Sequence, residues 1–179
     1  MGDADLGALL DRMTAAAMAG DGAGFAACFT PDGIYRDYVY GDHEGRDAIA
    51  HMLTDQFHRD AADYAWRFFD PMARGDHGYA WSLSTFLSRV PAFAGRRVVI
   101  DGISRFRLSG GLIADYAESV NGCTAMAQLG VGPARMRKVA AKWAGGLLDR
   151  AETRTWLADL GVDPASVRTD VLESDRSAG

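Results

Sequence analysis

The sequence predicts one α+β domain in which a curved, mainly antiparallel sheet wraps over N-terminal helices. Residues 5–58 carry apolar side chains at helical spacing on either side of one strand-like stretch. Four stretches rich in β-branched and aromatic residues follow, and the short turns between them favour antiparallel hairpins. The chain has 179 residues, of which 48% are apolar, so it can bury a core without a metal or a disulfide.

Three helices are predicted in the N-terminal part. Leucine, methionine and alanine recur every three or four residues over 5–19, and Gly20-Asp21-Gly22 ends this helix. A short helix over 23–28 stops at the turn sequence Thr30-Pro31-Asp32-Gly33. A third helix, over 47–58, has its apolar residues on one face and is expected to return across the first strand.

The strands are predicted from alternation and from β-branched and aromatic content. The first covers 34–40, where Tyr35 and Asp37 share one face, and a polar loop follows over 41–45. Pro71 is expected to kink or end the second strand, because proline cannot donate within a central ladder. The four later strands are predicted over 64–73, 79–87, 97–108 and 112–120.

The C-terminal part returns to helical spacing from Arg135, which predicts two helices broken at Gly145-Gly146. We interpret residues 1–131 as the main domain, 132–167 as a helical appendage and 168–179 as a polar tail that frays. The apolar stripe of the appendage needs burial, against a sheet edge, over a cavity mouth or against a second protomer.

Charge and cysteine content exclude several classes of protein. The net charge of −5 repels phosphate backbones, so no nucleic-acid partner is expected. Asp3 and Asp5 stand where a secretory signal would be basic, and no run of residues reaches membrane-spanning length. We therefore expect no export and no membrane partner. Cys28 and Cys123 are isolated, which favours a reduced, cytoplasmic setting, and the scattered histidines predict no metal site and no other cofactor.

Two groups of motifs carry a resemblance to a known family. The first comprises Ala19-Gly20-Asp21, Asp32-Gly33 and Gly45-Arg46-Asp47-Ala48-Ile49. The second comprises Gly95-Arg96-Arg97, the stretch from Phe106 to Ile113, and Gln128-Leu129-Gly130-Val131. With the order of predicted elements, they resemble the SnoaL-like branch of the nuclear transport factor 2-like superfamily. This branch includes polyketide cyclases and is related to ketosteroid isomerases and limonene-epoxide hydrolases. The resemblance covers residues 6–131 and implies a cone-shaped fold.

The resemblance also implies a deep apolar cavity enclosed by the sheet and the helices, for a small hydrophobic or aromatic ligand. Relatives with this fold commonly dimerise through the outer sheet face, so a homodimer that buries Phe69 and Leu87 is expected. Inward strand positions and the first helix would line the cavity. The expected lining residues are Met13, Tyr35, Tyr64, Trp66, Phe68, Ser104 and Phe106.

Asp37 is the first candidate catalytic residue. It follows Asp32-Gly33 in the first strand, at a position that resembles the proton-shuttling aspartate of ketosteroid isomerases. Aromatic neighbours would remove water from its carboxyl group, raise its pKa and make it a general base near neutral pH. The alternative is a structural carboxylate that bonds to backbone amides or to Arg36 or Arg46.

Glu118 and Tyr116 share the inward face of the last strand. Glu118 falls near the position where epoxide hydrolases of this fold keep an acid, so Asp37 and Glu118 could serve as base and acid. Either Tyr35 or Tyr116 could donate a hydrogen bond to an oxyanion. The alternative for Glu118 is an ion pair with Arg105 or Arg107.

The sequence departs from each related enzyme at one point. Met13 and Ser104 stand where ketosteroid isomerases have their oxyanion donors. The Arg-x-Asp motif of the epoxide hydrolases is absent from the third strand, and Asn121 and Gly122 stand near the acid of the cyclases. These departures argue against steroid isomerisation, against water activation in the manner of the epoxide hydrolases and against the cyclase mechanism. The reaction class stays open among isomerisation, hydration and cyclisation.

His58, after the third helix, is a further candidate because histidine titrates near neutral pH, although a histidine there can also cap the helix. We therefore expect a cofactor-free proton-transfer enzyme that uses Asp37 with Glu118 or His58. The alternative is a binding module with the same apolar pocket and no turnover. A third interpretation is a protein-interaction scaffold that uses the C-terminal helices.

Overall fold

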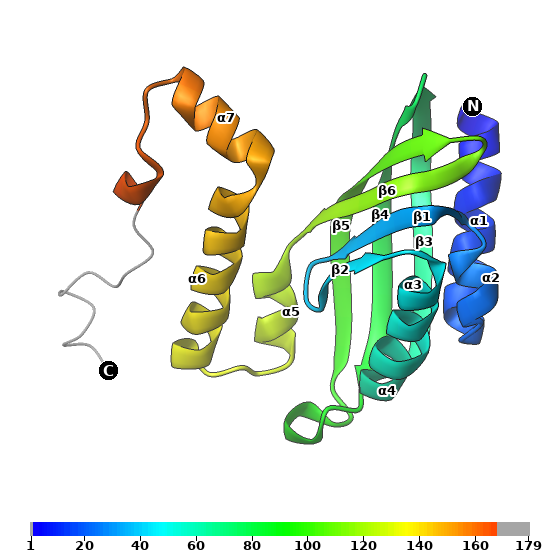
Figure 1. The fold of residues 1–179 in the computed structure, drawn as a ribbon. Coiled ribbons are helices and arrows are strands. Elements are labelled where there is room, and N and C mark those ends of the chain that lie inside the picture. The colour runs from blue at the N-terminus through cyan, green and yellow to red at the C-terminus, as the bar shows by residue number, and fades with distance from the viewer. Residues whose placement is uncertain (1, 168–179) are drawn as a thin grey trace. The chain divides into compact units, whose positions relative to one another are not determined.

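The computed structural model describes residues 2–167, and its largest element is a six-stranded sheet in the order β2-β1-β6-β5-β4-β3 (Figure 1). Neighbouring strands are antiparallel, except that β1 and β6 are parallel. The strands are β1 (Phe29–Asp37), β2 (Gly41–Glu44), β3 (Ala61–Arg74), β4 (His77–Ser88), β5 (Arg97–Ser109) and β6 (Leu112–Val120).

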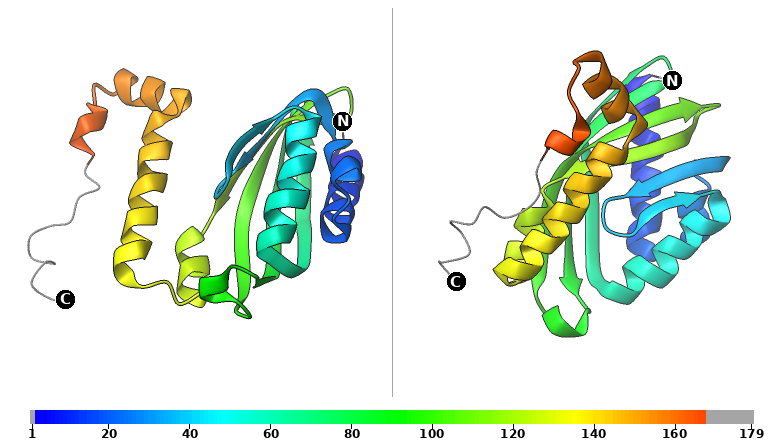
Figure 2. Two further views of the ribbon diagram at one scale, coloured as in Figure 1. Left: turned by 60° about the horizontal axis from the view of Figure 1, so that its bottom comes forward. Right: turned by 60° about the vertical axis from the view of Figure 1, so that its left-hand side comes forward.

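The N-terminal helices lie on one side of this sheet, as the two views of Figure 2 show. They are α1 (Asp3–Ala19), α2 (Gly22–Ala26), α3 (Arg46–Met52) and α4 (His58–Asp60), with a π-helical turn over Leu53–Phe57 between α3 and α4. The later helices are α5 (Gly122–Gln128), α6 (Pro133–Asp149) and α7 (Ala151–Asp159), and short 3₁₀ turns cover Pro91–Phe93 and Pro164–Ser166. Helices followed by a run of antiparallel strands confirm the predicted α+β fold class.

The core lies between α1, α2, α3 and the inward face of the sheet. The leucines and the methionine predicted to form the apolar stripe of α1 are buried, which explains why this helix begins and ends close to its predicted bounds. Each such side chain contributes roughly 1.5–3 kcal/mol when it is fully buried. The buried residues of the core include Leu6, Leu9, Leu10, Met13, Phe25, Phe29, Ile49, Met52, Phe106 and Ile113.

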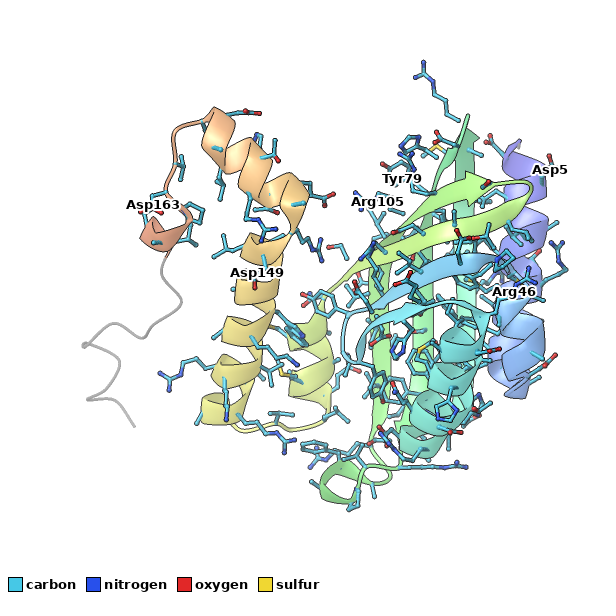
Figure 3. The ribbon with its side chains drawn as sticks, in the orientation of Figure 1. Asp5, Arg46, Tyr79, Arg105, Asp149 and Asp163 are labelled. Carbon is cyan, nitrogen blue, oxygen red and sulfur yellow. The ribbon has the colours of Figure 1, made fainter. Side chains whose placement is uncertain are left out.

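Arg46 ties α3 to the first strand. Its guanidinium donates from Nε and Nη2 to the Phe29 carbonyl oxygen, at 2.9 and 2.7 Å, and Figure 3 marks its place beside the strand. Gly45 precedes it with φ of 81°, a backbone conformation that glycine adopts without steric cost. This contact explains the Gly45-Arg46 motif as scaffold, since it fixes the start of α3 against β1.

Two segments predicted as turns or loops are strands instead. Residues 41–45 were expected to form a polar loop, but Gly41–Glu44 pairs with β1 as β2. Thr30-Pro31-Asp32-Gly33 lies inside β1, where the register with β6 shifts between Phe29 and Ile34. The turn-forming residues thus produce an irregularity in a strand, because pairing to neighbouring strands overrides their local preference.

The second predicted strand kinks at the expected place. β3 continues past Asp70-Pro71, but its register with β4 shifts between Phe69 and Met72. Asp70 has φ of 49°, a left-handed conformation that aspartate tolerates better than most residues. This confirms the kink predicted at Pro71.

The chain divides between Gly130 and Val131 into two compact units. In the second unit, α6 continues through Gly145-Gly146 and ends before Arg150, so the predicted break at the glycines is wrong. A helical glycine costs only about 1 kcal/mol relative to alanine, which the rest of a long helix can offset. No helix in the described part of the chain is long and apolar enough to cross a membrane. The predicted tail over 168–179 lies outside the described residues.

Candidate functional site

The parallel pairing of β1 and β6 brings the candidate carboxyl groups together. Tyr35 lies opposite Tyr116 in the register, so Asp37 and Glu118, the next inward positions of the two strands, are also neighbours. The rings of Tyr35 and Tyr116 stack with centroids 4.5 Å apart. On the other side of β6, Ser104 of β5 lies opposite Glu118.

A chain of hydrogen bonds ends on Glu118. The hydroxyl of Tyr116 donates to Oε2 of Glu118 at 2.7 Å, and the Ser104 hydroxyl lies 3.1 Å from the Tyr116 oxygen. Because Tyr116 has a single hydroxyl proton and gives it to Glu118, Ser104 must donate to Tyr116. Ser104 and Tyr116 are both fully buried, so this chain fixes the position of one oxygen of Glu118.

The pKa of Glu118 is raised from its ordinary value of 4.5 to about 7. Burial is the largest cause, because a charged carboxylate loses the water that stabilises it. The neighbouring charge of Asp37 raises the pKa further, whereas the hydrogen bonds from Tyr116 and from the backbone of Tyr38 lower it. Glu118 can therefore hold or release a proton near neutral pH.

Asp37 forms the turn between β1 and β2 and also faces Glu118. Its Oδ1 accepts hydrogen bonds from the backbone N–H groups of Val39 and Tyr40, at 2.7 and 2.5 Å. Burial raises the pKa of Asp37, while these two bonds and the nearby His43 lower it. The backbone contacts are those expected of a structural carboxylate, and both of them engage Oδ1, so Oδ2 takes part in neither.

Aromatic side chains surround the two carboxyl groups. Burial and the charges of Glu118 and Asp37 raise the pKa of Tyr64, whose ring lies 6.2 Å from Phe57 and 6.5 Å from Trp66, between centroids. Burial also raises the pKa values of Tyr35 and Tyr116 well above normal. All three phenol groups therefore stay protonated at neutral pH and can act as hydrogen-bond donors.

The remaining expected lining residues, Met13, Trp66, Phe68 and Phe106, belong to the hydrophobic core or pack against it. Phe106 contacts Tyr116, with ring centroids 5.5 Å apart, and Phe68 lies between Phe106 and Trp66. Met13 is fully buried in the same apolar cluster. Phe106, Phe68, Trp66 and Met13 thus extend the wall of apolar side chains from Tyr116 toward α1.

His58 lies away from the carboxyl pair. Its Nε2 is 2.8 Å from the carbonyl oxygen of Ala17, and its ring packs against Gly20. The side chain therefore joins α4 to the C-terminal end of α1. This contact gives His58 a structural partner at a different place in the core.

His43, which sequence reasoning assigned to a loop, faces the site from β2. It lies directly opposite Tyr35 in the β1–β2 register, so its side chain is on the inward face. Its Nε2 is buried and has no hydrogen-bond partner among residues 2–167. Had residues 41–44 been recognised as a strand, alternation would have placed His43 beside Tyr35.

A separate open groove of about 730 Å³ lies elsewhere on the first unit. It is lined by Asp11, Thr14 and Met18 of α1 and by residues of β3, β4 and β5, including Trp66, Leu83 and Val99. Of the expected lining residues, Trp66 is shared with this groove, and neither carboxyl of the pair borders it. Across the part of the chain that the structure describes, no three His, Cys, Asp or Glu side chains are grouped as metal ligands.

The raised pKa of Glu118 predicts a pH-dependent loss of stability. A carboxyl group with a higher pKa in the folded than in the unfolded state stabilises the fold most below the unfolded pKa. This contribution is lost as pH rises through the folded value. Between pH 4.5 and about 7, wild-type stability should therefore fall relative to that of Glu118→Gln, and the full loss should reach about 3 kcal/mol at pH 8.

Urea unfolding of both proteins at pH 5 and pH 8 measures this difference, with Glu44→Gln, at an exposed position on β2, as the matched control. Equal pH dependence of the wild type and Glu118→Gln would show that Glu118 has an ordinary pKa.

Comparison with known proteins places this chain in a family. The family model described as the SnoaL-like domain matches residues 10–116. No protein of curated function matches the sequence significantly. Among solved structures, TsrD from Streptomyces laurentii is similar at 18% identity and a TM-score of 0.64, over 74% of this chain and 99% of that one.

Two further structures have the same fold. A hypothetical protein of ketosteroid isomerase-like fold from Catenulispora acidiphila, in complex with trimethylamine, is 17% identical, with a TM-score of 0.62. The match covers 69% of this chain and 93% of that one. An epoxide hydrolase from M. tuberculosis, of the limonene-epoxide hydrolase type, is 13% identical over 75% of this chain and 96% of that one, with a TM-score of 0.59. The match to the family model confirms the resemblance in the motifs, and the chain belongs to the SnoaL-like family, with the nuclear transport factor 2-like fold.

Proposed function

We propose that the chain is an acid–base catalyst that moves a proton on a small, largely apolar carbonyl compound, with Asp37 as base and Glu118 as acid. The observation that carries this proposal is the pairing of two inward carboxyl groups at the end of β1 and β6, with Tyr116 bonded to one of them. Two carboxyl groups with different environments can divide the roles of base and acid between them.

The environments favour this division of roles. Burial raises the pKa of both carboxyl groups. Two backbone N–H groups oppose this effect at Asp37 by stabilising its charged form, whereas at Glu118 the charge of Asp37 adds to it and favours the protonated form. Below about pH 7, Glu118 therefore holds a proton, and the two N–H bonds to Oδ1 favour the ionised form of Asp37 beside it. A site in this state offers one base and one acid at the same time.

The proposed reaction is a proton shift next to a carbonyl group. Oδ2 of Asp37 takes a proton from the carbon beside the carbonyl, and the protonated Glu118 gives its proton to the carbonyl oxygen, which forms an enol. In a substrate with a carbon–carbon double bond beside that carbon, the product of this step is a dienol. Return of the proton from Asp37 to the far carbon of the dienol, with recovery of the enol proton by Glu118, moves the double bond into conjugation with the carbonyl group and gives the isomer. Both carboxyl groups end in their starting protonation states, so the reaction needs no further acid or base.

The hydrogen-bond chain supports the acid role of Glu118. Because Ser104 and Tyr116 hold Oε2, the other oxygen of Glu118 is the one that can carry a proton to a ligand. Tyr35 and Tyr64, whose phenol groups stay protonated, supply further donors near the pair. The apolar body of the substrate would lie along the aromatic side chains of this wall.

The relatives agree with this class of chemistry without identifying a substrate. One similar structure is an epoxide hydrolase and another binds trimethylamine, each at less than 25% identity. A second candidate function, ligand binding without turnover, is favoured by the two backbone bonds to Oδ1 of Asp37, which are typical of a structural carboxylate.

Proton exchange distinguishes the two functions. The wild type should accelerate deuterium incorporation next to the carbonyl in at least one of a panel of apolar cyclic ketones, followed by NMR in D₂O. Asp37→Asn and Glu118→Gln should each lower this rate by about 10²-fold or more, the range of general acid–base catalysis. The rate should fall as pH rises through about 7, because Glu118 then loses its proton.

Asp32→Asn is the matched control, because Asp32 is exposed on the same strand as Asp37. Its rate and melting temperature should equal those of the wild type. Binding of a ketone with no exchange above the buffer rate would establish the binding module instead.

We further propose that the chain forms a homodimer through the outer face of the sheet. Large apolar side chains of β4 and β5 are 40–50% exposed there, which is unusual for a face that meets water. Tyr79 and Arg105 are direct partners at one end of this face (Figure 3), and Trp81 lies opposite Ile103. The exposed apolar residues are Tyr79, Trp81, Leu83, Val99 and Ile103.

Trp81→Glu should convert the dimer to a monomer, because it buries a charge without a partner in the interface. Light scattering after gel filtration measures the mass. Val39→Glu, which changes an exposed apolar residue on the β1–β2 turn, should remain dimeric. A monomeric wild type would contradict the proposal.

A further inference from the structure

His43 is held on the inward face of the sheet by the pairing of β1 and β2. Its backbone lies opposite Tyr35, whose side chain is only 2% exposed. Direct partners in an antiparallel pair point to the same side, so the imidazole enters the aromatic region around Tyr35. The register therefore directs this side chain toward the core, where a polar group is costly.

The imidazole has an unused hydrogen-bonding atom in this position. Nε2 of His43 is buried and, among the described residues, no group bonds to it. Leaving such an atom unpaired costs the fold the free energy of removing it from water, and most buried polar atoms in proteins are paired. An apolar side chain in this place would avoid the cost, so the fold alone gives no reason for a histidine here.

The groups that face His43 belong to the proposed site. His43 is near enough to Asp37 to lower the pKa of that carboxyl group, and Asp37 lies two residues along β1 from its partner Tyr35. Tyr35 in turn contacts Phe57 from the helical side, with an edge-on geometry, and stacks on Tyr116 from β6. The free nitrogen thus lies among flat rings and beside the candidate base.

We propose that Nε2 of His43 hydrogen bonds the ligand of this site, and that the ligand is a flat, conjugated molecule with a hydroxyl or carbonyl oxygen. The inference rests on the site proposed above but does not require turnover. The imidazole nitrogen accepts from a hydroxyl in one tautomer and donates to a carbonyl in the other, so either oxygen satisfies it. The aromatic walls provide the complementary surface for a flat body.

The test compares two probes of nearly equal shape, 2-naphthol and 2-methylnaphthalene, whose binding is followed by their own fluorescence. The wild type should bind 2-naphthol about five- to tenfold more tightly, which is the effect of one hydrogen bond. His43→Phe should remove this preference by weakening only 2-naphthol. His43→Gln, which keeps a polar atom near the position of Nε2, should retain part of it.

Thermal unfolding without ligand gives a second readout. His43→Phe removes the unpaired buried nitrogen, so its melting temperature should rise, by ~2–4 °C for a chain of this size. A substitution that stabilises the free protein and weakens binding identifies a residue kept for the ligand. His51→Phe is the matched control, because His51 is exposed and pairs with Asp55 on the surface. This substitution should change neither the preference for 2-naphthol nor the binding constants of the two probes.

The preference between the probes decides the proposal. If the wild type binds both probes equally or binds neither, or if His43→Phe keeps the preference, His43 does not bind the ligand in this way. Failure of the proposed function is recognised separately, because it would abolish proton exchange and its dependence on Asp37 and Glu118. A preference for 2-naphthol that depends on His43 would survive that failure.

Discussion

The parallel pairing of β1 with β6 is the contact on which the proposed site depends. Antiparallel hairpins account for the other neighbours in the sheet, and each joins strands that are close in sequence. The β1–β6 pair instead joins the beginning and the end of the first unit, and it places Asp37 beside Glu118. Without this register, the charge of Asp37 would not raise the pKa of Glu118. The fold thus provides the basis of the proposed chemistry by bringing together two carboxyl groups that would separate in water.

The site combines features that oppose stability in the free protein. Two carboxyl groups repel each other, both lose water, and His43 keeps a buried nitrogen without a partner among the described residues. The surrounding core offsets these costs through α1 and the aromatic residues from Tyr35 to Phe106. Local instability within a stable scaffold is common where side chains are placed for a ligand.

Much of the fold could be predicted from the sequence because its patterns are local. The apolar stripe of α1, the alternation in β3 to β6 and the turns between them all appear within short windows. The strand β2 could not be recognised in this way, because Gly41–Glu44 is short and polar and forms only by pairing with β1. For the same reason His43 was missed.

Alternation did place Asp37, Tyr116 and Glu118 on inward faces, but their mutual contact depends on a pairing between distant strands. The surroundings of His58 could not be predicted either, since its bond to Ala17 depends on how α4 packs against α1.

Asp37 raises the pKa of Glu118 because the two carboxyl groups are neighbours, and carbon-13 NMR of the Glu118 carboxyl group during a pH titration measures this effect. In the wild type, the midpoint should lie at about 7, and Asp37→Asn should lower it, because the neighbouring charge is then removed. A wild-type midpoint near the ordinary value of 4.5, or a midpoint that Asp37→Asn leaves unchanged, would contradict the account.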